Sequence, residues 1–466
     1  MRALLDVTPS AEQLSLFSRT NNGVEVIRGA AGSGKTTTAL LKLRSSIGSF
    51  INRQKRQGTT TPLQILVLTY NRTLSGYISE LASKQFSSDE NIELQICTFA
   101  KWAVRTIGPQ EIISSQQQSQ FLRSIPTSLS LDSSFIEEEI EYLTGRFLPE
   151  SLQDYLSVRR EGRGGTPRVE RPAREIILNE IIARYEAFKV ANGLVDWNDI
   201  AVQMARVKHY NYDIVIVDET QDFSANQIRA IIKQLAPVHA LTFVLDTAQR
   251  IYARGFTWQE VGITVRPENS FRLQKNYRST KQIAALARSL VSGIGIDDDG
   301  TMPDYEQASR NGIKPIMLLG TYSAQVEFAL KTVREKIDLE KESVAFLHPK
   351  GGGWFSFLRQ QLDDQLIDYA EITREAEWPT GDENIALSTL HSSKGLEFDH
   401  VFILGLNAEI LQHGEEIDDE RLTMLRRLIS MGIGRAKQSV ILGYKPQTKA
   451  PIIDFFDKNT YTEVVV

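Results

Sequence analysis

The stretch VEVIRGAAGSGKTTTALLKL, residues 24–43, joins a short apolar segment to a glycine-rich turn and then to a helical pattern. It contains the phosphate-loop template G-x-x-x-x-G-K-[ST], whose fixed positions are Gly29, Gly34, Lys35 and Thr36. A turn that only connects a strand to a helix is the alternative, and it is disfavoured because the full template stands in the expected strand-to-helix context. The stretch therefore predicts an α/β domain that binds a nucleoside triphosphate.

Each part of this loop has a chemical role. Glycines let backbone N–H groups approach phosphate oxygens, and the N-terminus of the following helix adds a partial positive charge. Lys35 can reach the β and γ phosphates, while the Thr36 hydroxyl can ligate Mg²⁺. The residues predicted to bind the nucleotide here are Gly29, Gly32, Ser33, Gly34, Lys35, Thr36 and Thr37.

The composition is that of an ordinary globular protein. The chain has 466 residues, of which 41% are hydrophobic and 24% charged, and this length suggests roughly two to four domains. No apolar run approaches a membrane span and no signal peptide is recognised, so we expect a cytoplasmic protein. Cys97 is the single cysteine, which excludes internal disulfides and cysteine-built metal sites. Any metal is therefore expected to be oxygen-bound, most simply Mg²⁺.

The stretch YDIVIVDETQDF, residues 212–223, is a continuous apolar run that ends on acids. Such a run is typical of a buried strand in a parallel sheet. A strand that ends in a solvated acidic loop would give the same pattern. In a phosphate-loop enzyme, however, a second buried strand ends in an Asp that ligates magnesium, and an adjacent Glu can orient the attacking water. Asp218 and Glu219 fit these two roles.

Five further stretches follow the pattern of one family. They are LVLTYNRTLSGYI (66–78), VLDTAQRIYARGFTW (244–258), LQKNYRST (273–280), ALSTLHSSKGLEFDHVFI (386–403) and RRLISMGIGRAK (426–437). Together with the phosphate loop and VDETQD, they stand in the order found in superfamily 1 helicases. The chain resembles the UvrD/Rep-type branch of that superfamily, from Gln13 to Lys437. This resemblance implies an α/β fold of two RecA-like phosphate-loop NTPase domains.

The resemblance implies the roles of residues around the nucleotide. Glu219 is the expected catalytic base, and Asp218 with Thr36 the expected magnesium ligands. Arg278 and Arg435 resemble arginine fingers that reach the γ phosphate, the second from across the cleft. The residues that resemble the adenine sensor, the ring stacked on adenine and the ribose contact are, in that order, Gln13, Tyr277 and Glu397. Those that resemble links between the γ phosphate and the DNA site are Gln221 and Gln249.

The resemblance also implies a single-strand track. Aromatic rings on which bases stack, mixed with hydroxyl donors to phosphates, are what single-strand binding requires. The implied contacts are Thr69, Tyr70, Asn71, Thr98, Phe99, Tyr252, Trp258, Thr389 and His391. Taken singly, each aromatic is more often a core residue than a platform. His391 is either a polar residue at a strand end or a relay between DNA and nucleotide.

An arginine-rich stretch, SVRREGRGGTPRVERPAR (157–174), leaves two interpretations open. It is either a loop that tracks phosphates or a flexible surface linker, and we favour the linker because Glu161 and Glu170 interrupt the positive charge.

The α/β pattern occurs in two halves. It predicts a first RecA-like domain at residues 1–103 and 191–270, and a second at 271–466. Residues 104–190 are helical and polar in pattern, which predicts a small helical subdomain inserted in the first domain. Larger relatives carry a big accessory helical domain in the second half, where this chain has only residues 372–385.

The last motif departs from the family pattern. Ser430 stands where a tyrosine is common, and Gly432 and Gly434 stand where alanine and threonine are common. Because glycine in a helix costs about 1 kcal/mol relative to alanine, we expect a looser segment around Arg435.

These features predict an ATP-dependent 3′–5′ translocase and helicase that uses ATP and Mg²⁺ on single-stranded DNA with a 3′ tail. The direction rests on QRIY (249–252) and NYRS (276–279), since the opposite branch usually has a proline shortly after that glutamine. An alternative is an ATP-gated nucleic-acid-binding subunit that licenses a partner such as a nuclease. RNA stays open as an alternative strand.

Overall fold

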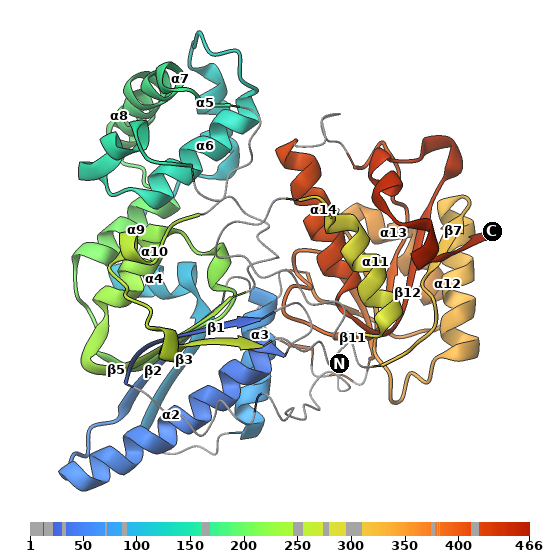
Figure 1. Cartoon of the computed structure of the whole chain (residues 1–466), viewed down its shortest axis with the longest axis horizontal. Coiled ribbons are helices and arrows are strands. Elements are labelled where there is room, and N and C mark those ends of the chain that lie inside the picture. Colours follow the sequence, from blue (N-terminus) through green and yellow to red (C-terminus); the bar gives the residue numbers. More distant parts are fainter. Residues whose placement is uncertain are drawn as a thin grey trace.

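The computed structural model describes residues 13, 22–29, 34–69, 72–85, 91–160, 168–245, 255–273, 279–294, 310–373, 378–379, 381, 383–411 and 419–466. These residues form two α/β domains, with a helical insertion in the first (Figure 1). The predicted fold class is thereby confirmed. In this described part of the chain, no helix is both long and apolar enough to span a membrane.

The first domain is built on a six-stranded sheet with the strand order β3-β2-β4-β5-β1-β6, in which every pairing is parallel. The strands are β1 (Gly23–Gly29), β2 (Leu63–Thr69), β3 (Ile92–Thr98), β4 (Tyr212–Val217), β5 (Leu235–Leu245) and β6 (Ser270–Leu273). Four consecutive residues of β4, 214–217, are buried. This is the pattern of a strand that is covered on both faces.

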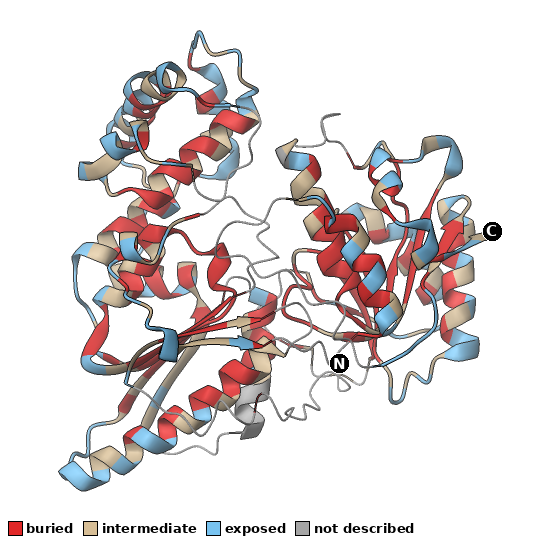
Figure 2. Cartoon of the chain, viewed as in Figure 1, coloured by how far each residue is buried: buried red, intermediate tan, exposed pale blue. Residues whose placement is uncertain are grey.

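Helices cover both faces of this sheet because alternate strand residues point to opposite sides. One face packs against α2 (Lys35–Gln57) and α3 (Arg72–Gln85). The other packs against α4 (Phe99–Ile107), α9 (Trp197–Arg206) and α10 (Ala225–Lys233). The buried residues follow the strands and the inner faces of the helices (Figure 2).

The insertion has its own apolar core. Its helices are α5 (Ser115–Ser124), α6 (Ser133–Arg146), the 3-10 helix η2 (Pro149–Leu156), α7 (Arg171–Ile176), the π-helical η3 (Ile177–Ile182) and α8 (Ala183–Asn192). The predicted start of the insertion at residue 104 falls inside α4, which packs on the first domain. The insertion therefore begins later than predicted, and its last helix runs to Asn192.

The second domain is built on a seven-stranded parallel sheet with the strand order β13-β7-β12-β11-β8-β10-β9. Its strands are β7 (Ile316–Leu319), β8 (Val344–His348), β9 (Ala370–Glu371), β10 (Ile385–Thr389), β11 (Phe398–Ile403), β12 (Ala436–Tyr444) and β13 (Thr462–Val465). Its helices are α11 (Lys281–Val291), α12 (Tyr322–Lys336), α13 (Ser356–Asp364) and α14 (Glu420–Ile433). Residues 372–384 are all that separate β9 from β10.

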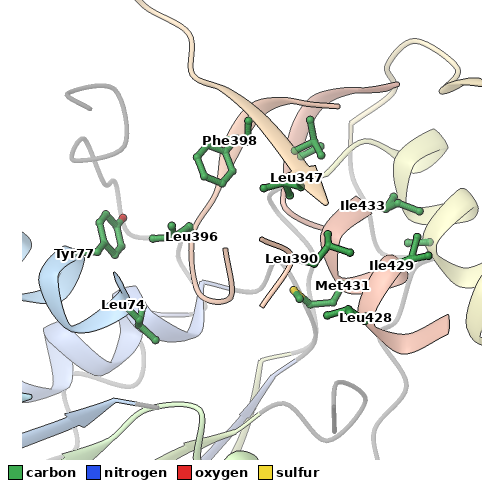
Figure 3. Close-up of a cluster of buried hydrophobic side chains, with 14 of the residues drawn as sticks. Leu74, Tyr77, Leu347, Leu390, Leu396, Phe398, Leu428, Ile429, Met431 and Ile433 are labelled. Atoms are coloured by element: carbon green, nitrogen blue, oxygen red, sulfur yellow. The ribbon is translucent and has the colours of Figure 1, made fainter. Parts of the chain in front are cut away.

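Helix α3 joins the two domains at their base. The Thr73 hydroxyl donates to the backbone carbonyl of Ile372 over 3.2 Å, and the ring centroids of Tyr77 and Trp378 lie 5.0 Å apart. Figure 3 shows Leu74 and Tyr77 on one side of this junction and Leu396 on the other. One apolar cluster thus continues from the first domain into the second.

Candidate active site between the two domains

The phosphate loop starts where β1 ends and finishes at the N-terminus of α2. Gly34 precedes the helix with a φ of 74°, a left-handed conformation that glycine adopts without strain. The Lys35 ammonium donates to the backbone carbonyl of Gly29 over 3.0 Å, which spans the loop. The first turn of α2 contains no acidic residue of its own, so the partial positive charge of this helix end is available to an anion.

Gln13 contacts the end of this loop. Its Nε2 donates to the backbone carbonyl of Gly34 over 2.8 Å, and the side chain is buried. A Cβ at Gly34 would displace the end of the Gln13 side chain, and the positive φ at this position favours glycine. The residue that we expect to sense adenine is therefore held against the loop that we expect to hold phosphates.

The two predicted magnesium ligands, Thr36 at the start of α2 and Asp218 after β4, are in hydrogen-bond contact. The Thr36 hydroxyl donates to Asp218 Oδ2 over 2.9 Å, and the backbone N–H of Glu219 donates to Asp218 Oδ1. Burial, followed by the negative charge of Glu219, raises the pKa of Asp218 to about 7. A hydroxyl beside a buried carboxylate is a set of oxygen ligands that fits Mg²⁺, and the charge of the cation would stabilise the ionised carboxylate.

Glu219 follows β4 in a left-handed conformation, with a φ of 53°, which is uncommon for a residue other than glycine. Its Oε2 accepts a hydrogen bond from the side-chain amide of Gln221. Burial opposes the ionised form, but the charges of Lys394, Lys35 and Arg435 outweigh it and lower the pKa of Glu219. The carboxylate is thus held ionised, as a general base must be.

Lys394 brings the second domain to this carboxylate. It follows β10, is 1% exposed, and its ammonium forms an ion pair with Asp222 and lies 3.4 Å from Glu219 Oε2. Neither Lys394 nor Asp222 was among the predicted site residues. The only sequence signal was their placement inside two of the quoted motifs, since nothing in either motif shows that the two meet.

Arg435, the expected second finger, also lies at this junction. It is 3% exposed, its Nε lies 3.2 Å from the sulfur of Met431, and its charge contributes to the lowered pKa of Glu219. The site therefore gathers Lys35 from the first domain with Lys394 and Arg435 from the second around one carboxylate.

The expected looseness of the last motif is not what the structure shows. Gly432 lies in α14 directly against Leu390, and a Cβ there would overlap the leucine side chain. The Ser430 hydroxyl donates to the backbone carbonyl of Ala287 over 2.8 Å, which ties α14 to α11. The small residues thus allow close packing, which is the opposite of the predicted effect.

The other described residues of the nucleotide group occupy the expected elements. Thr37 lies in the first turn of α2, and Gln221 lies two residues after Glu219 in the buried turn that follows β4. Glu397 is half-buried immediately before β11. Eight predicted site residues lie outside the described residues, and their roles stay predictions: Gly32, Ser33, Tyr70, Asn71, Gln249, Tyr252, Tyr277 and Arg278.

The predicted track residues of the first domain differ in exposure. Thr69 ends β2 and is fully buried, whereas Thr98 ends β3 and caps α4 by accepting from the Lys101 N–H. Phe99 is 5% exposed and packs edge-on against Trp102, so its ring serves the core in this conformation. Trp258 is half-buried, and its ring centroid lies 4.9 Å from that of Phe243.

The predicted track residues of the second domain lie at the end of β10. The Thr389 hydroxyl donates to the Ser392 hydroxyl over 3.0 Å, and the Thr389 side chain packs on the backbone of Gly351. Burial, followed by the charge of Lys394, lowers the pKa of His391. His391 is therefore neutral at physiological pH and lies near the lysine that reaches Glu219.

The arginine-rich stretch is largely structural among its described residues. The Arg160 guanidinium binds the fully buried Glu139, with its closest N–O distance at 2.6 Å. Arg174 donates to three backbone carbonyls of the insertion, and Arg171 pairs with Glu175. These contacts favour neither a phosphate-tracking loop nor a flexible linker for those positions.

Comparison with known proteins shows which family the chain is similar to. Residues 10–260 match the family model of the UvrD/REP helicase N-terminal domain, and residues 357–447 match that of the UvrD-like helicase C-terminal domain. A probable DNA helicase of Mycoplasma pneumoniae is 21% identical over 91% of this chain and 80% of its own length. The ATP-dependent DNA helicase UvrD2 of Mycobacterium tuberculosis is 24% identical over 57% of this chain and 54% of its own length.

Another relative has a higher sequence identity over a shorter stretch. The ATP-dependent DNA helicase Rep of Buchnera aphidicola is 37% identical over 87 residues, which are 19% of this chain and 12% of that protein. Because the N-terminal family model alone covers more than half of the 466 residues, and the two domains with their shared site have the matching architecture, this chain belongs to the UvrD/REP helicase family.

Proposed function

We propose that the chain is an ATP-dependent translocase and helicase that moves 3′ to 5′ on single-stranded DNA. The observation that carries this proposal is the position of Glu219, which lies just after a strand of one domain and 3.4 Å from the Lys394 ammonium of the other. A nucleotide bound beside Glu219 would therefore contact both domains, so that hydrolysis could change how they close.

The residues divide the chemistry among them. The backbone of the phosphate loop and Lys35 would bind the phosphates, and Thr36 with Asp218 would hold Mg²⁺, which when bound neutralises charge on the phosphate oxygens. Glu219, kept ionised by its cationic neighbours, would orient the attacking water and accept its proton. Arg435 would stabilise the negative charge that develops on the γ phosphate.

The ion pair between Lys394 and Asp222 supports coupling between hydrolysis and motion. Both side chains are fully buried, so each carboxylate at the site depends on cations for its charge balance. A γ phosphate would compete with Glu219 for those cations and release Lys394 in part. The closure of the two domains would thus depend on whether ATP or its products occupy the site.

The direction and the strand rest on family membership. The Rep and UvrD2 relatives are named ATP-dependent DNA helicases, which supports DNA as the strand. The 3′–5′ direction rests on the quoted motifs of the 3′–5′ branch. ATP hydrolysis with and without single-stranded DNA or RNA, followed by displacement of strands from 3′- and 5′-tailed duplexes, tests both points, with Lys35→Ala as the inactive control.

The alternative is an ATP-gated binding subunit that licenses a partner such as a nuclease. The observation that favours it is the short connection between β9 and β10, residues 372–384, which leaves the second domain without an accessory unit at that place. A translocation assay separates the two functions. ATP-driven removal of streptavidin from one end of a biotinylated strand supports the translocase, whereas ATP-dependent binding without such removal supports the binding subunit.

A further inference from the structure

The insertion is fixed firmly to the first domain. The side-chain amide of Asn198 donates to the Thr144 hydroxyl over 2.8 Å, and that of Asn226 donates to the backbone carbonyls of Thr144 and Phe147 over 2.8 and 2.9 Å. Both asparagines are buried. Because buried amides are costly to leave unpaired, the insertion and the first domain should move as one body.

A buried arginine adds to this attachment. Arg146 of α6 is 3% exposed and binds Glu260 through two nitrogens over 2.7 and 3.0 Å. Glu260 follows the predicted base-stacking residue Trp258 by two positions. The insertion therefore contacts the segment that presents one part of the predicted strand track.

The insertion also reaches the second domain, by a contact of a different kind. Arg421, in the first turn of α14, pairs with Asp132 over 3.1 Å and contacts the Ser134 hydroxyl at the start of α6. The side chains of Arg421 and Asp132 are 52% and 64% exposed. Exposed ion pairs add little to stability and weaken with salt, so this contact can open readily.

The two domains thus meet along two lines. The lower line is the packing of α3 and the buried pair of Lys394 with Asp222. The upper line is the contact of the insertion with the start of α14, and both lie in the upper part of the view in Figure 1. Trp258 lies two residues before Glu260, which binds the insertion, and His391 lies three residues before Lys394.

We propose that Asp132, Ser134 and Arg421 form a clasp that closes over a single nucleic-acid strand, so that the chain encircles the strand it binds. The inference rests on the proposed function, because it takes the strand to lie between the domains. The clasp lets a firmly held insertion meet the second domain through a contact that opens for loading. A strand without ends could then enter only while the clasp is open.

Cross-linking the clasp tests this directly. The variant Asp132→Cys/Arg421→Cys, joined by a short bismaleimide, links the two exposed positions covalently. Cys97, the single native cysteine, is 2% exposed, and burial raises the pKa of its thiol to about 11. It should therefore not react with the bismaleimide in place of the two introduced cysteines. The control is Arg359→Cys/Glu371→Cys, an ion pair of 2.8 Å that lies within the second domain and does not bridge the clasp.

The chain is loaded on circular or linear single-stranded DNA, cross-linked, and washed at high salt, which removes protein held only by phosphate contacts. We expect the clasp variant to stay on circles and to be lost from linear strands, whereas the control is lost from both. Cross-linking before DNA is added should prevent loading on circles. Equal loss from circles and linear strands, or failure of the two cysteines to cross-link with strand bound, overturns the clasp.

The outcome is separable from that of the proposed function. Failure of the uncross-linked chain to bind either strand counts against the proposed function itself. A second variant needs no cross-link: Arg421→Glu should shorten the lifetime of the chain on circular DNA, and the charge swap Asp132→Arg/Arg421→Glu should restore it. The double variant Arg421→Glu/Glu463→Arg has the same net charge as the swap but places the new cation on the exposed edge strand β13, so it should not restore the lifetime. Restoration by the swap alone separates a clasp from a general loss of positive charge, and equal lifetimes for all these proteins contradict the clasp.

Discussion

The Lys394 ammonium of the second domain forms an ion pair with the Asp222 carboxylate of the first, and both side chains are buried at the site of the predicted catalytic base. The same lysine lies 3.4 Å from Glu219. The two domains are therefore joined by charge at the place where the chemistry is proposed to occur.

The first prediction concerns the pH dependence of hydrolysis. Lys394 is the strongest of the charges that lower the pKa of Glu219, so Lys394→Met should raise that pKa. The base would then stay protonated to a higher pH, and the acidic limb of the kcat–pH profile should move upward. Asp222→Asn is the matched control, because it keeps the lysine beside Glu219 and should not move the limb upward. If the acidic limb of the kcat–pH profile is unchanged in Lys394→Met, the ionisation of Glu219 does not determine that limb.

The second prediction separates binding from hydrolysis. Glu219→Gln keeps the shape of the side chain but cannot accept a proton, so it should bind ATP and lose nearly all turnover. Lys35→Ala removes the cation that spans the phosphate loop and should lose ATP binding as well. Equilibrium binding of a fluorescent ATP analogue, measured beside steady-state hydrolysis with saturating DNA, checks both. Parental hydrolysis by Glu219→Gln would refute the assignment of the base.

The third prediction concerns Arg435. Arginine fingers are worth about 10³ to 10⁵ in rate in phosphate-loop enzymes, so Arg435→Ala should lower hydrolysis far more than ATP affinity. Single-turnover hydrolysis and ATP binding measured on the same preparation give the two values. A large loss of affinity with near-normal single-turnover hydrolysis would mean that Arg435 serves binding and not the transition state.

The fourth prediction tests the packing of α14. Alanine is the better helix former, yet Gly432→Ala would place a methyl group into Leu390, and such overpacking costs about 1 to 3 kcal/mol. Gly48→Ala is the matched control, since Gly48 lies in α2 with no atom near a new Cβ, and it should stabilise by up to about 1 kcal/mol. Opposite shifts in the denaturant midpoint are expected. Stabilisation by both variants would contradict the close packing.

The fifth prediction concerns an acidic cluster in the first domain. Lys189 pairs with Glu186, Asp196 and Asp199, three carboxylates close enough to hold a metal ion. Because the Lys189 ammonium already binds all three carboxylates in the place where a cation would sit, EDTA should leave the melting temperature unchanged. Lys189→Met should lower stability by about 3 to 5 kcal/mol, as expected when one partner of a buried ion pair is removed.

The control for that variant is Lys341→Met, which breaks an exposed ion pair with Asp338 and should change the melting temperature little. A fall in melting temperature of the parental chain on adding EDTA would show that the carboxylates hold a metal after all.

The elements with local signals were predictable from the sequence. The phosphate loop and β4 each carry their information within about a dozen residues, because a glycine-rich turn and a continuous apolar run need no distant partner to be recognised. The meeting of Thr36 with Asp218 followed from the same two motifs. The family pattern then placed Arg435 at the junction.

Contacts between domains were not predictable in this way. Lys394 and Asp222 are 172 residues apart, and their pairing depends on how two separately folded sheets pack. The role of Gly432 likewise depends on Leu390, which comes from a different element. Helix propensity measures the cost of glycine in an isolated helix and takes no account of neighbouring elements. It therefore predicted a loose segment at a position where the Leu390 side chain occupies the space that a larger residue would need.

The strand β6 lies in the first sheet although the chain continues from it into the second domain. Its residues Ser270 to Leu273 pair with β1, and Leu273 stands opposite Gly29, where the phosphate loop begins. The predicted boundary after residue 270 therefore falls inside this strand. A fragment ending there would lack most of β6 and leave that edge of β1 unpaired beside the predicted nucleotide site. A fragment ending at residue 273 or later would keep β1 paired with β6. The second fragment is the one with which to measure how tightly half of the enzyme holds ATP by itself.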